Sequence, residues 1–346
     1  IYTAPKEQYT KDLLAAVPVL GSRSFDEKPI KTDGDEDAPL LEIKDLSVRF
    51  PIKRQLFFRK RKEVVAVENV SLKINKGKTL GLVGESGCGK STICKAIVGL
   101  VRAQTGSITV DGLAVNTATA RQSLKMRRKA QIVFQDPMAA LSPRRTAFAQ
   151  ISEPLYIHRF GSHAEIRNRV EWLMEKVGLN SDHMNRYPHE FSGGQRQRIC
   201  IARALSLSPA LVIADEPVSA LDVSIQAKVL ELLQSIQDEL GITYLFISHD
   251  MAVIEKVSDD IAVMFRGRIV EYGTSEAVLR NPAHAYTKNL LQAVPVPDPM
   301  IEFNPPVFYG SNGYSPIVTS GTQQHDRLSY LQVEQNHFVA ADNPMN

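Results

Sequence analysis

One short segment has the residue types and spacing of a loop that binds the phosphates of a nucleotide. It fits the pattern G-x-x-x-x-G-K-[ST] and reads Gly84-Glu85-Ser86-Gly87-Cys88-Gly89-Lys90-Ser91-Thr92. Glycines in this pattern let backbone N–H groups curl around a phosphate, because no Cβ stands in the way. The ammonium of Lys90 then reaches the β- and γ-phosphates, and the hydroxyl of Ser91 binds Mg²⁺. The segment therefore predicts binding of a nucleoside triphosphate together with magnesium.

Two carboxylates follow an apolar run later in the chain, where Asp215 and Glu216 come directly after Leu211-Val212-Ile213-Ala214. Acidic side chains at the end of a buried strand are costly unless they have a task, and α/β sheets bind ligands at this edge. We expect Asp215 to hold Mg²⁺ through water. We expect Glu216 to act as general base, or to orient the attacking water, at the γ-phosphate. Together with the loop, these residues predict a nucleoside triphosphatase.

A second segment offers another phosphate-binding corner. Phe191 is followed by Ser192-Gly193-Gly194-Gln195, and the next residues, to Leu205, have helical apolar spacing. A hydroxyl and free N–H groups at a helix N-terminus favour an anion. Because two such corners in one domain cannot easily serve the same nucleotide, the pattern favours a head-to-tail pair in which this corner reaches the nucleotide of another domain.

At this point the sequence resembles the ATP-binding-cassette (ABC) family, whose signature is LSGGQ; Phe191 departs from it conservatively. The resemblance covers residues 39–297 and implies ATP and Mg²⁺ as ligands. It implies that Gln135 touches Mg²⁺ and senses a membrane partner. It also implies that His249 contacts the γ-phosphate, that Ser219-Ala220-Leu221-Asp222 lines the interface between two cassettes, and that Phe50 stacks on adenine.

Three segments narrow the resemblance to the dipeptide, oligopeptide and nickel importer ATPases. They are the phosphate-loop segment, Tyr187–Arg198 and the closing Asn281-Pro282-Ala283-His284-Ala285-Tyr286-Thr287. The implied function is ATP binding and hydrolysis coupled to import of small peptides. The implied partners are a second cassette, two membrane permease subunits and, indirectly, a periplasmic or extracellular peptide-binding protein, with no nucleic acid. The implied location is peripheral, on the cytoplasmic face of the inner membrane.

The elements that must position these residues alternate between strands and helices. Apolar and β-branched runs predict strands at 41–50, 64–74, 79–83, 130–134, 211–214 and 243–247. Helical spacing predicts helices at 90–100, 164–177, 196–205 and 224–239. Such alternation indicates an α/β fold. The resemblance implies a P-loop NTPase cassette with a RecA-like core, an antiparallel β subdomain and an α-helical subdomain that carries the signature.

A repeat organises the ends of the chain. Tyr9–Val19 reads almost letter for letter like Tyr286–Val296, so we interpret residues 1–20 as the C-terminal remnant of a preceding ABC cassette in a longer tandem chain. That arrangement resembles the glutathione-importer type of ATPase. Residues 21–38 are polar and predict a linker, residues 39–297 the cassette, and residues 298–346 a loosely ordered C-terminal tail.

Composition excludes several classes of protein. The 346 residues carry a formal charge of only +3, which does not by itself argue for nucleic acid. No run approaches the roughly 18 apolar residues of a membrane-spanning helix. Cys88, Cys94 and Cys200 have no metal-ligand spacing, and their odd number favours a reducing compartment over a disulfide framework. Some members of the family that this chain resembles carry a C-terminal cysteine cluster for an iron–sulfur centre, and since no Cys follows Cys200 we predict none here. The basic stretch 53–62 could touch lipid or nucleic acid, but a solvated hairpin insertion is the simpler interpretation.

Two alternatives remain open from the sequence alone. One is a soluble ABC ATPase that acts on the ribosome or on DNA; the short linker and the short spacing between phosphate loop and signature do not favour it. The other is a regulatory cassette that binds ATP without hydrolysis, which the presence of both Glu216 and His249 disfavours. The cargo stays open among dipeptides, oligopeptides, glutathione and nickel.

Overall fold

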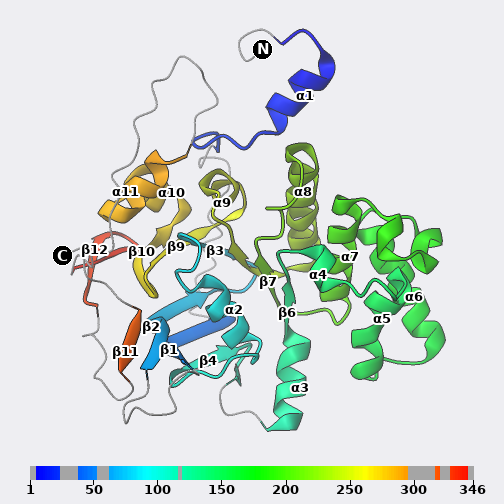
Figure 1. The fold of residues 1–346 in the computed structure, drawn as a ribbon, viewed down its shortest axis with the longest axis horizontal. Helices are drawn as coiled ribbons and strands as arrows, with labels where there is room; N and C mark the ends of the chain where they lie inside the picture. Colours follow the sequence, from blue (N-terminus) through cyan, green and yellow to red (C-terminus); the bar gives the residue numbers. More distant parts are fainter. Residues whose placement is uncertain are drawn as a thin grey trace.

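Two β-sheets organise the protein, and the phosphate-loop segment lies between them (Figure 1). The computed structural model describes residues 5–23, 38–52, 62–115, 119–294, 316–319 and 328–341. The five-stranded sheet is antiparallel, in the order β11 (Ile317–Thr319), β2 (Lys62–Ile74), β1 (Leu41–Pro51), β4 (Thr105–Val110) and β5 (Leu113–Ala114).

The second sheet has eight strands with a parallel centre. Its order is β12 (Tyr330–Glu334), β13 (His337–Ala340), β10 (Arg268–Thr274), β9 (Asp260–Phe265), β3 (Thr79–Val83), β8 (Thr243–Ile247), β7 (Leu211–Asp215) and β6 (Ala130–Val133). The strands β9, β3, β8, β7 and β6 run parallel to one another, so their carboxyl ends share one edge of the sheet. Strands β10, β13 and β12 extend this sheet in antiparallel pairs.

Helices cover both faces of the eight-stranded sheet. Near the five-stranded sheet lie α2 (Lys90–Ile97) and α3 (Ala120–Lys129). A helical subdomain, seen at the right of Figure 1, holds α4 (Pro137–Ala140), α5 (Ala147–Ile157), α6 (His163–Lys176) and α7 (Gly193–Leu205), together with the 3₁₀ turns Ser181–Asn185 and Pro188–Glu190. The remaining helices are α1 (Gln8–Ala16), α8 (Val223–Leu240), α9 (Met251–Val257), α10 (Ser275–Arg280) and α11 (Ala285–Gln292).

The central strands are apolar on both sides because each side faces a different core. Along β7, Leu211 and Ile213 pack with the five-stranded sheet and α2, whereas Val212 and Ala214 pack with the helical subdomain. All five residues of β7 are buried. This explains why the strand reads as an uninterrupted apolar run and not as an alternation.

The structure confirms the expected α/β architecture with its antiparallel and helical parts. Every predicted strand and helix is present, with bounds that shift by a few residues at the ends. In the described part of the chain, no helix combines the length and apolar character that crossing a bilayer requires. Residues 24–37 of the expected linker and residues 53–61 of the basic stretch lie outside the described residues.

The structure differs from the expected tail over residues 298–346, because β11, β12 and β13 all fall within it. Strand β13 pairs with the otherwise unpaired edge of β10, and its end residues His337 and Ala340 are buried. Strand β12 has all five residues exposed. Backbone pairing therefore holds β12 in place although its alternating Leu331 and Val333 are exposed. Two strands of five and four residues are a weak sequence signal.

The N-terminal segment contacts the cassette at two helices, with α1 against α8 and the residues after α1 against α9. The backbone N–H of Gly21 donates to Glu255 Oε2 at 2.8 Å. The Arg23 guanidinium donates to the carbonyls of Glu255 at 2.7 Å and Ser258 at 2.6 Å. Leu20 packs against the core on the helical side. The residues that follow α1 are thus attached to the cassette well before the chain enters β1.

A buried ion pair joins the two sheets. Glu68 of β2 accepts from Arg268 of β10, with Oε2 at 2.7 Å from Nη2 and 3.1 Å from Nε. The side chains are only 5% and 16% exposed. Beside them, the N–H of Glu68 donates to the carbonyl of Gly267 at 2.9 Å. A side-chain pair and a backbone bond therefore fasten β2 to the turn that precedes β10.

We expect the substitution Glu68→Ala to lower the free energy of unfolding by about 3 kcal/mol, because it leaves the buried Arg268 charge without its carboxylate. Urea denaturation measures this change. The matched control is Glu276→Ala, which breaks the exposed pair of Glu276 and Arg280 and should cost about 0.5 kcal/mol. Equal losses in the two variants would contradict the structural role of the Glu68–Arg268 pair.

Candidate functional site

The phosphate-loop segment occupies a space between β2 and β9 that has no room for side chains at two glycines. A Cβ on Gly84 would lie 2.1 Å from the carbonyl oxygen of Met264, and φ of Gly84 is +147°. A Cβ on Gly89 would lie 2.3 Å from the carbonyl oxygen of Ala66, at a φ of +115°. Both the left-handed backbone and the close approach therefore require glycine here.

The Lys90 side chain is buried and turned back onto its own loop. Its Nζ donates to the carbonyls of Gly84 at 2.6 Å and Glu85 at 2.9 Å. A buried ammonium needs such acceptors, since desolvation of an unpaired charge is expensive. These carbonyls solvate the ammonium beside the loop amides, which is the position a phosphate-binding lysine needs.

A serine and a carboxylate meet at the end of β7. The Ser91 hydroxyl donates to Asp215 Oδ1 at 3.2 Å. Burial raises the pKa of Asp215, and the nearby Glu216 raises it further, while the Ser91 hydrogen bond and the Lys90 charge lower it. A hydroxyl and a desolvated carboxylate are hard oxygen donors, the type that Mg²⁺ prefers. The pair fits the magnesium role predicted for it.

The Glu216 carboxylate joins two loops that leave neighbouring strands. Its Oε2 accepts from Gln135 Nε2 at 2.8 Å and lies 3.3 Å from His249 Nδ1. Gln135 follows β6 and His249 follows β8, so the three side chains predicted to be catalytic converge at one sheet edge. The imidazole is 62% exposed and therefore accessible from solvent.

Local backbone features hold these three residues. Glu216 has a left-handed φ of +49°, which costs a non-glycine residue about 1 kcal/mol. Its N–H donates to Ile247 of β8 at 3.0 Å. After both Gln135 and His249, an aspartate caps the next helix: Asp136 accepts from Met138 N at 2.7 Å, and Asp250 accepts from Ala252 N at 2.9 Å. Gln135 and His249 thus each lie just before a capped helix start, whereas Glu216 is held by its backbone bond to β8.

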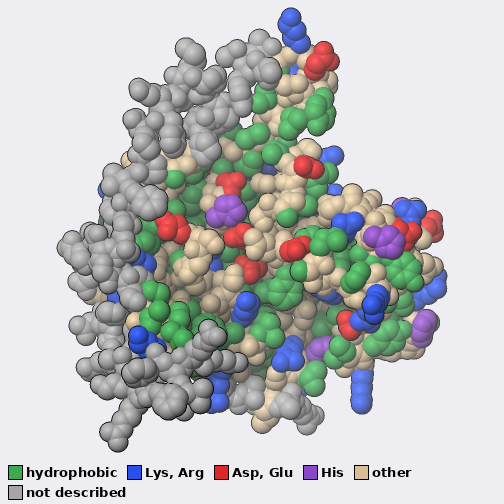
Figure 2. Space-filling view, in the orientation of Figure 1, with side chains coloured by type: hydrophobic (Ala, Val, Ile, Leu, Met, Phe, Trp, Pro, Cys, Tyr) green, Lys and Arg blue, Asp and Glu red, His purple; other side chains and the backbone are tan. Residues whose placement is uncertain are grey.

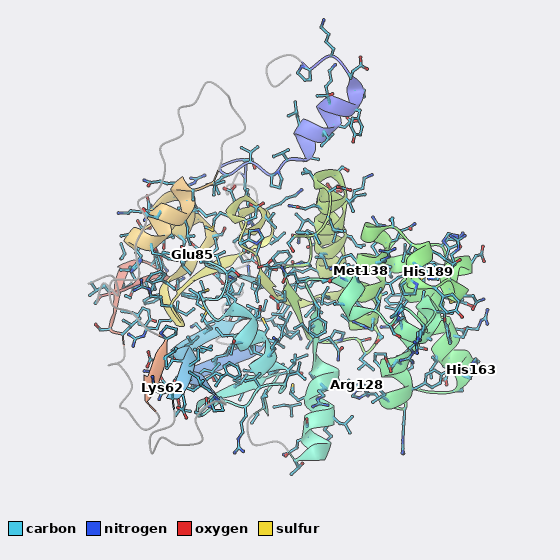
Figure 3. The ribbon with its side chains drawn as sticks, in the orientation of Figure 1. Lys62, Glu85, Arg128, Met138, His163 and His189 are labelled. Carbon is cyan, nitrogen blue, oxygen red and sulfur yellow. The ribbon has the colours of Figure 1, made fainter. Side chains whose placement is uncertain are left out.

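In the view of Figure 2, acidic side chains and a histidine gather near the middle of the face, over the region where Figure 1 places β3, β7 and α9. Figure 3 shows Glu85 beside the end of the molecule that carries α10 and α11, and Met138 at the junction with the helical subdomain. The site therefore lies at the carboxyl edge of the parallel strands of the eight-stranded sheet.

Two sets of predicted binding residues are not brought to the loop. Ser192 and Gln195 form a reciprocal cap at the start of α7, with Ser192 N donating to Gln195 at 2.9 Å. Gly194 packs against Ile225, where a Cβ would lie 2.4 Å from Cγ2. Phe50, at the end of β1, is 39% exposed. Among the described residues, neither Phe50 nor residues 192–195 form a hydrogen bond with the phosphate loop.

One residue at the loop was not predicted as part of the site. The Tyr286 hydroxyl accepts from the backbone N–H of Glu85 at 3.0 Å. Tyr286 is only 2% exposed, and its ring lies 4.3 Å from that of Phe265. The sequence did hold a signal, because Tyr286 belongs to the closing segment and to the repeat with Tyr9.

Two family models match the chain. Residues 67–219 match the model described as ABC transporter. Residues 270–308 match the model described as oligopeptide/dipeptide transporter, C-terminal region. The second match extends beyond the expected end of the cassette at residue 297.

Curated relatives carry the name "Glutathione import ATP-binding protein GsiA". The protein from Pectobacterium atrosepticum is 46% identical over 358 residues, covering 98% of this chain and 57% of the relative. The protein from Salmonella typhi is 49% identical over 317 residues, covering 86% of this chain and 51% of the relative. The chain thus spans little more than half the length of these relatives.

Solved ABC structures share the fold. The dimeric cassette MJ0796 in a post-hydrolysis state with ADP and Pi superposes with a TM-score of 0.60 at 29% identity, covering 68% of this chain and 98% of that one. CbiO1 from Clostridium perfringens, part of the transporter complex cbiONQ, gives a TM-score of 0.61 at 26% identity, covering 70% of this chain and 91% of that one.

We expect Gly89→Ala to lose nucleotide binding by at least about tenfold, because the methyl group would meet the Ala66 carbonyl and displace the loop. Gly87→Ala is the matched control, since Gly87 also has a positive φ but its Cβ would meet nothing within 4 Å. The control should cost only about 1 kcal/mol of backbone strain. Fluorescence titration with a labelled ATP analogue measures both, and similar affinities would contradict the close packing of the loop.

Proposed function

The chain carries an ATP-binding cassette of the ABC transporter family, and on that premise we propose that it binds and hydrolyses ATP to drive import of small peptides through a separate permease. The observation that supports hydrolysis most is the convergence of Glu216 with Gln135 and His249 beside the Ser91–Asp215 pair. A cassette that only binds nucleotide would not need a general base at this position.

The roles follow from the contacts. Lys90 exchanges the carbonyls of its own loop for the β- and γ-phosphates, whose negative charge is the better partner for a buried ammonium. Mg²⁺, held by Ser91, Gln135 and Asp215, would neutralise charge on the phosphates. Glu216 accepts a proton from the attacking water or orients it. His249 faces Glu216 across the site and donates to the γ-phosphate.

The signature residues serve a second cassette in this proposal. Ser192–Gln195 start a helix and point no hydrogen bond at their own phosphate loop within the described chain. Their amides suit the ATP of a partner cassette arranged head to tail, with Phe50 stacking on adenine at the cassette's own site. ATP binding would then close the pair, and hydrolysis would open it.

The N-terminal helix α1 has features that are expected of the end of a preceding cassette in a longer chain. Helix α1 has no buried residue, and Tyr9 is 75% exposed. Its sequence twin α11 buries Tyr286 and Thr287. The repeated sequence is thus buried against the cassette in α11, whereas in α1 none of its residues is buried. This supports the interpretation of residues 1–20 as the end of another cassette.

Small peptides are proposed as cargo from the match of residues 270–308 and from the names of the relatives. The chain would act peripherally at the cytoplasmic face of the inner membrane, beneath two permease subunits that receive cargo from a binding protein. None of the named relatives favours the alternative of an ATPase on the ribosome or on DNA.

We expect Glu216→Gln to bind ATP but hydrolyse it at least about a hundredfold more slowly, as is usual for loss of a general base. The amide should keep the contact with Gln135, so binding persists. Single-turnover hydrolysis and size-exclusion chromatography with ATP measure the two effects. Lys90→Ala is the control that should lose binding itself, and wild-type turnover in Glu216→Gln would refute the assigned role.

We expect Met138→Glu to weaken association with permease-containing membranes on the order of tenfold, since Met138 is 55% exposed beside the Gln135 loop and an apolar interface anchor contributes about 1–2 kcal/mol. ATP binding should not change. Leu100→Glu is the control, because Leu100 is 60% exposed but follows α2, on a different segment from the Gln135 loop. Membrane sedimentation measures association, and equal behaviour of the two variants would argue against this contact.

A further inference from the structure

A chain of buried contacts connects the C-terminal hairpin, β12–β13, with the phosphate loop. The hairpin lies beyond both segments that match family models. We propose that this hairpin positions the loop, through Glu271 and the start of α11, by holding the Tyr286 hydroxyl against the backbone N–H of Glu85. The inference rests on the proposed function, because it assigns these residues to the affinity for ATP.

The first step joins the hairpin to β10. His337 begins β13, and its Nε2 lies 2.7 Å from Glu271 Oε1, with both side chains completely buried. The strands are paired at Glu271 and Val339 and at Tyr272 and Phe338. Tyr330 of β12 adds a hydrogen bond of 2.8 Å to the carbonyl of Ile269. A buried carboxylate needs several donors, and the hairpin supplies one of them.

The second step joins Glu271 to the start of α11. Glu271 Oε1 also accepts from Ala283 N at 2.7 Å, and Oε2 accepts from His284 N at 3.0 Å. His284 caps the helix, since its Nδ1 accepts from Tyr286 N at 3.1 Å. Burial lowers the pKa of His284, with Glu271 opposing the shift, so a neutral ring can accept at Nδ1. One carboxylate thus fixes both residues that precede α11.

The third step reaches the phosphate loop. The peptide between Gly84 and Glu85 is bonded at both ends: its carbonyl accepts from Lys90 Nζ at 2.6 Å, and its N–H donates to Tyr286 at 3.0 Å. Burial raises the pKa of Tyr286, which keeps the hydroxyl neutral. Tyr286 therefore sets the orientation of the peptide that faces the phosphate-binding lysine. It is a positioning residue, since it touches the loop and not the reacting atoms.

Preorganisation gives the expected direction of the effect. A loop whose peptide is free to rotate must be ordered when the nucleotide binds, and the affinity falls by that cost. Tyr286→Phe keeps the ring against Phe265 and removes only the acceptor. The KM and Kd for ATP should rise about three- to tenfold, the factor that one net hydrogen bond supplies, while kcat stays within about twofold.

The experiment compares variants of the full chain by titration with a fluorescent ATP analogue and by steady-state hydrolysis. Tyr244→Phe is the matched control, because the Tyr244 hydroxyl is also buried but donates to Leu233, away from the loop. It should leave KM unchanged. Hydrogen exchange of the nucleotide-free protein gives an independent signal, since the amide of Glu85 should exchange faster in Tyr286→Phe than in the wild type.

The role of the hairpin is tested at His337. Gln supplies an N–H near the position of Nε2, so His337→Gln should keep the wild-type KM, whereas His337→Leu should raise it as Tyr286→Phe does. A variant that combines Tyr286→Phe with His337→Leu should have a KM no higher than that of the single variant with the higher KM, because both changes act through one path. If the Leu variant does not fold, Tyr330→Phe takes its place, because it removes the hydrogen bond from β12 to the carbonyl of Ile269. A KM that stays at the wild-type value in Tyr330→Phe would then overturn the path from the hairpin.

The outcomes separate the two proposals. If the wild type binds ATP and Tyr286→Phe has the same KM and the same exchange rate at the amide of Glu85, the positioning role is overturned. The ATPase assignment is then left intact. Fully additive effects of Tyr286→Phe and His337→Leu would overturn the path from the hairpin. Failure of the wild type itself to bind ATP would overturn the proposed function instead.

Discussion

The phosphate loop lies in a gap between two sheets that is too narrow for side chains, and the rest of the architecture maintains that gap. Carbonyl oxygens of Ala66 on one side and Met264 on the other stand where Cβ atoms of Gly89 and Gly84 would be. The Glu68–Arg268 pair joins the two walls, and the bond from Gly267 N to Cys88 O at 2.9 Å joins the loop to the turn before β10. Each wall is a backbone segment of a sheet, so its position depends on whole strands and not on single side chains.

The two carboxylates at the end of β7 lower the stability of the strand, although the proposed chemistry needs them there. Asp215 is desolvated and Glu216 has a left-handed backbone, and either feature would be unfavourable in a purely structural strand. The cost is offset locally, since Ser91 donates to Asp215, and Gln135 and His249 approach Glu216. Three segments that are distant in the sequence therefore contact one strand end, and a shift of that strand would disturb all three contacts.

The sequence predicts the site residues better than their connections. The phosphate loop and the two carboxylates carry a local pattern of their own, whereas Gln135 and His249 were proposed only through the resemblance to the ABC family. The structure places Gln135 and His249 beside Glu216. Strands β12 and β13 were missed because they are short. They are held by backbone pairing of β13 with β10 and of β12 with β13, and the alternating apolar residues of β12 are exposed. Tyr286 was noted only as part of the repeat and of the closing segment. Its bond to Glu85 joins residues far apart in the chain, and no local pattern encodes such a contact. For the same reason, the Glu68–Arg268 pair was not foreseen.

The attachment of Gly21 and Arg23 to α9 has a mechanical consequence. Helix α9 begins at Met251, two residues after His249, and its last turn carries the acceptors for the N-terminal segment. A pull on that segment therefore reaches α8, which α1 contacts, and α9, which holds Gly21 and Arg23, before it reaches β1. Force can thus enter the cassette at two helices, whereas the covalent chain enters it at β1. A domain that moves at the far end of this segment would pull on the helix that follows His249.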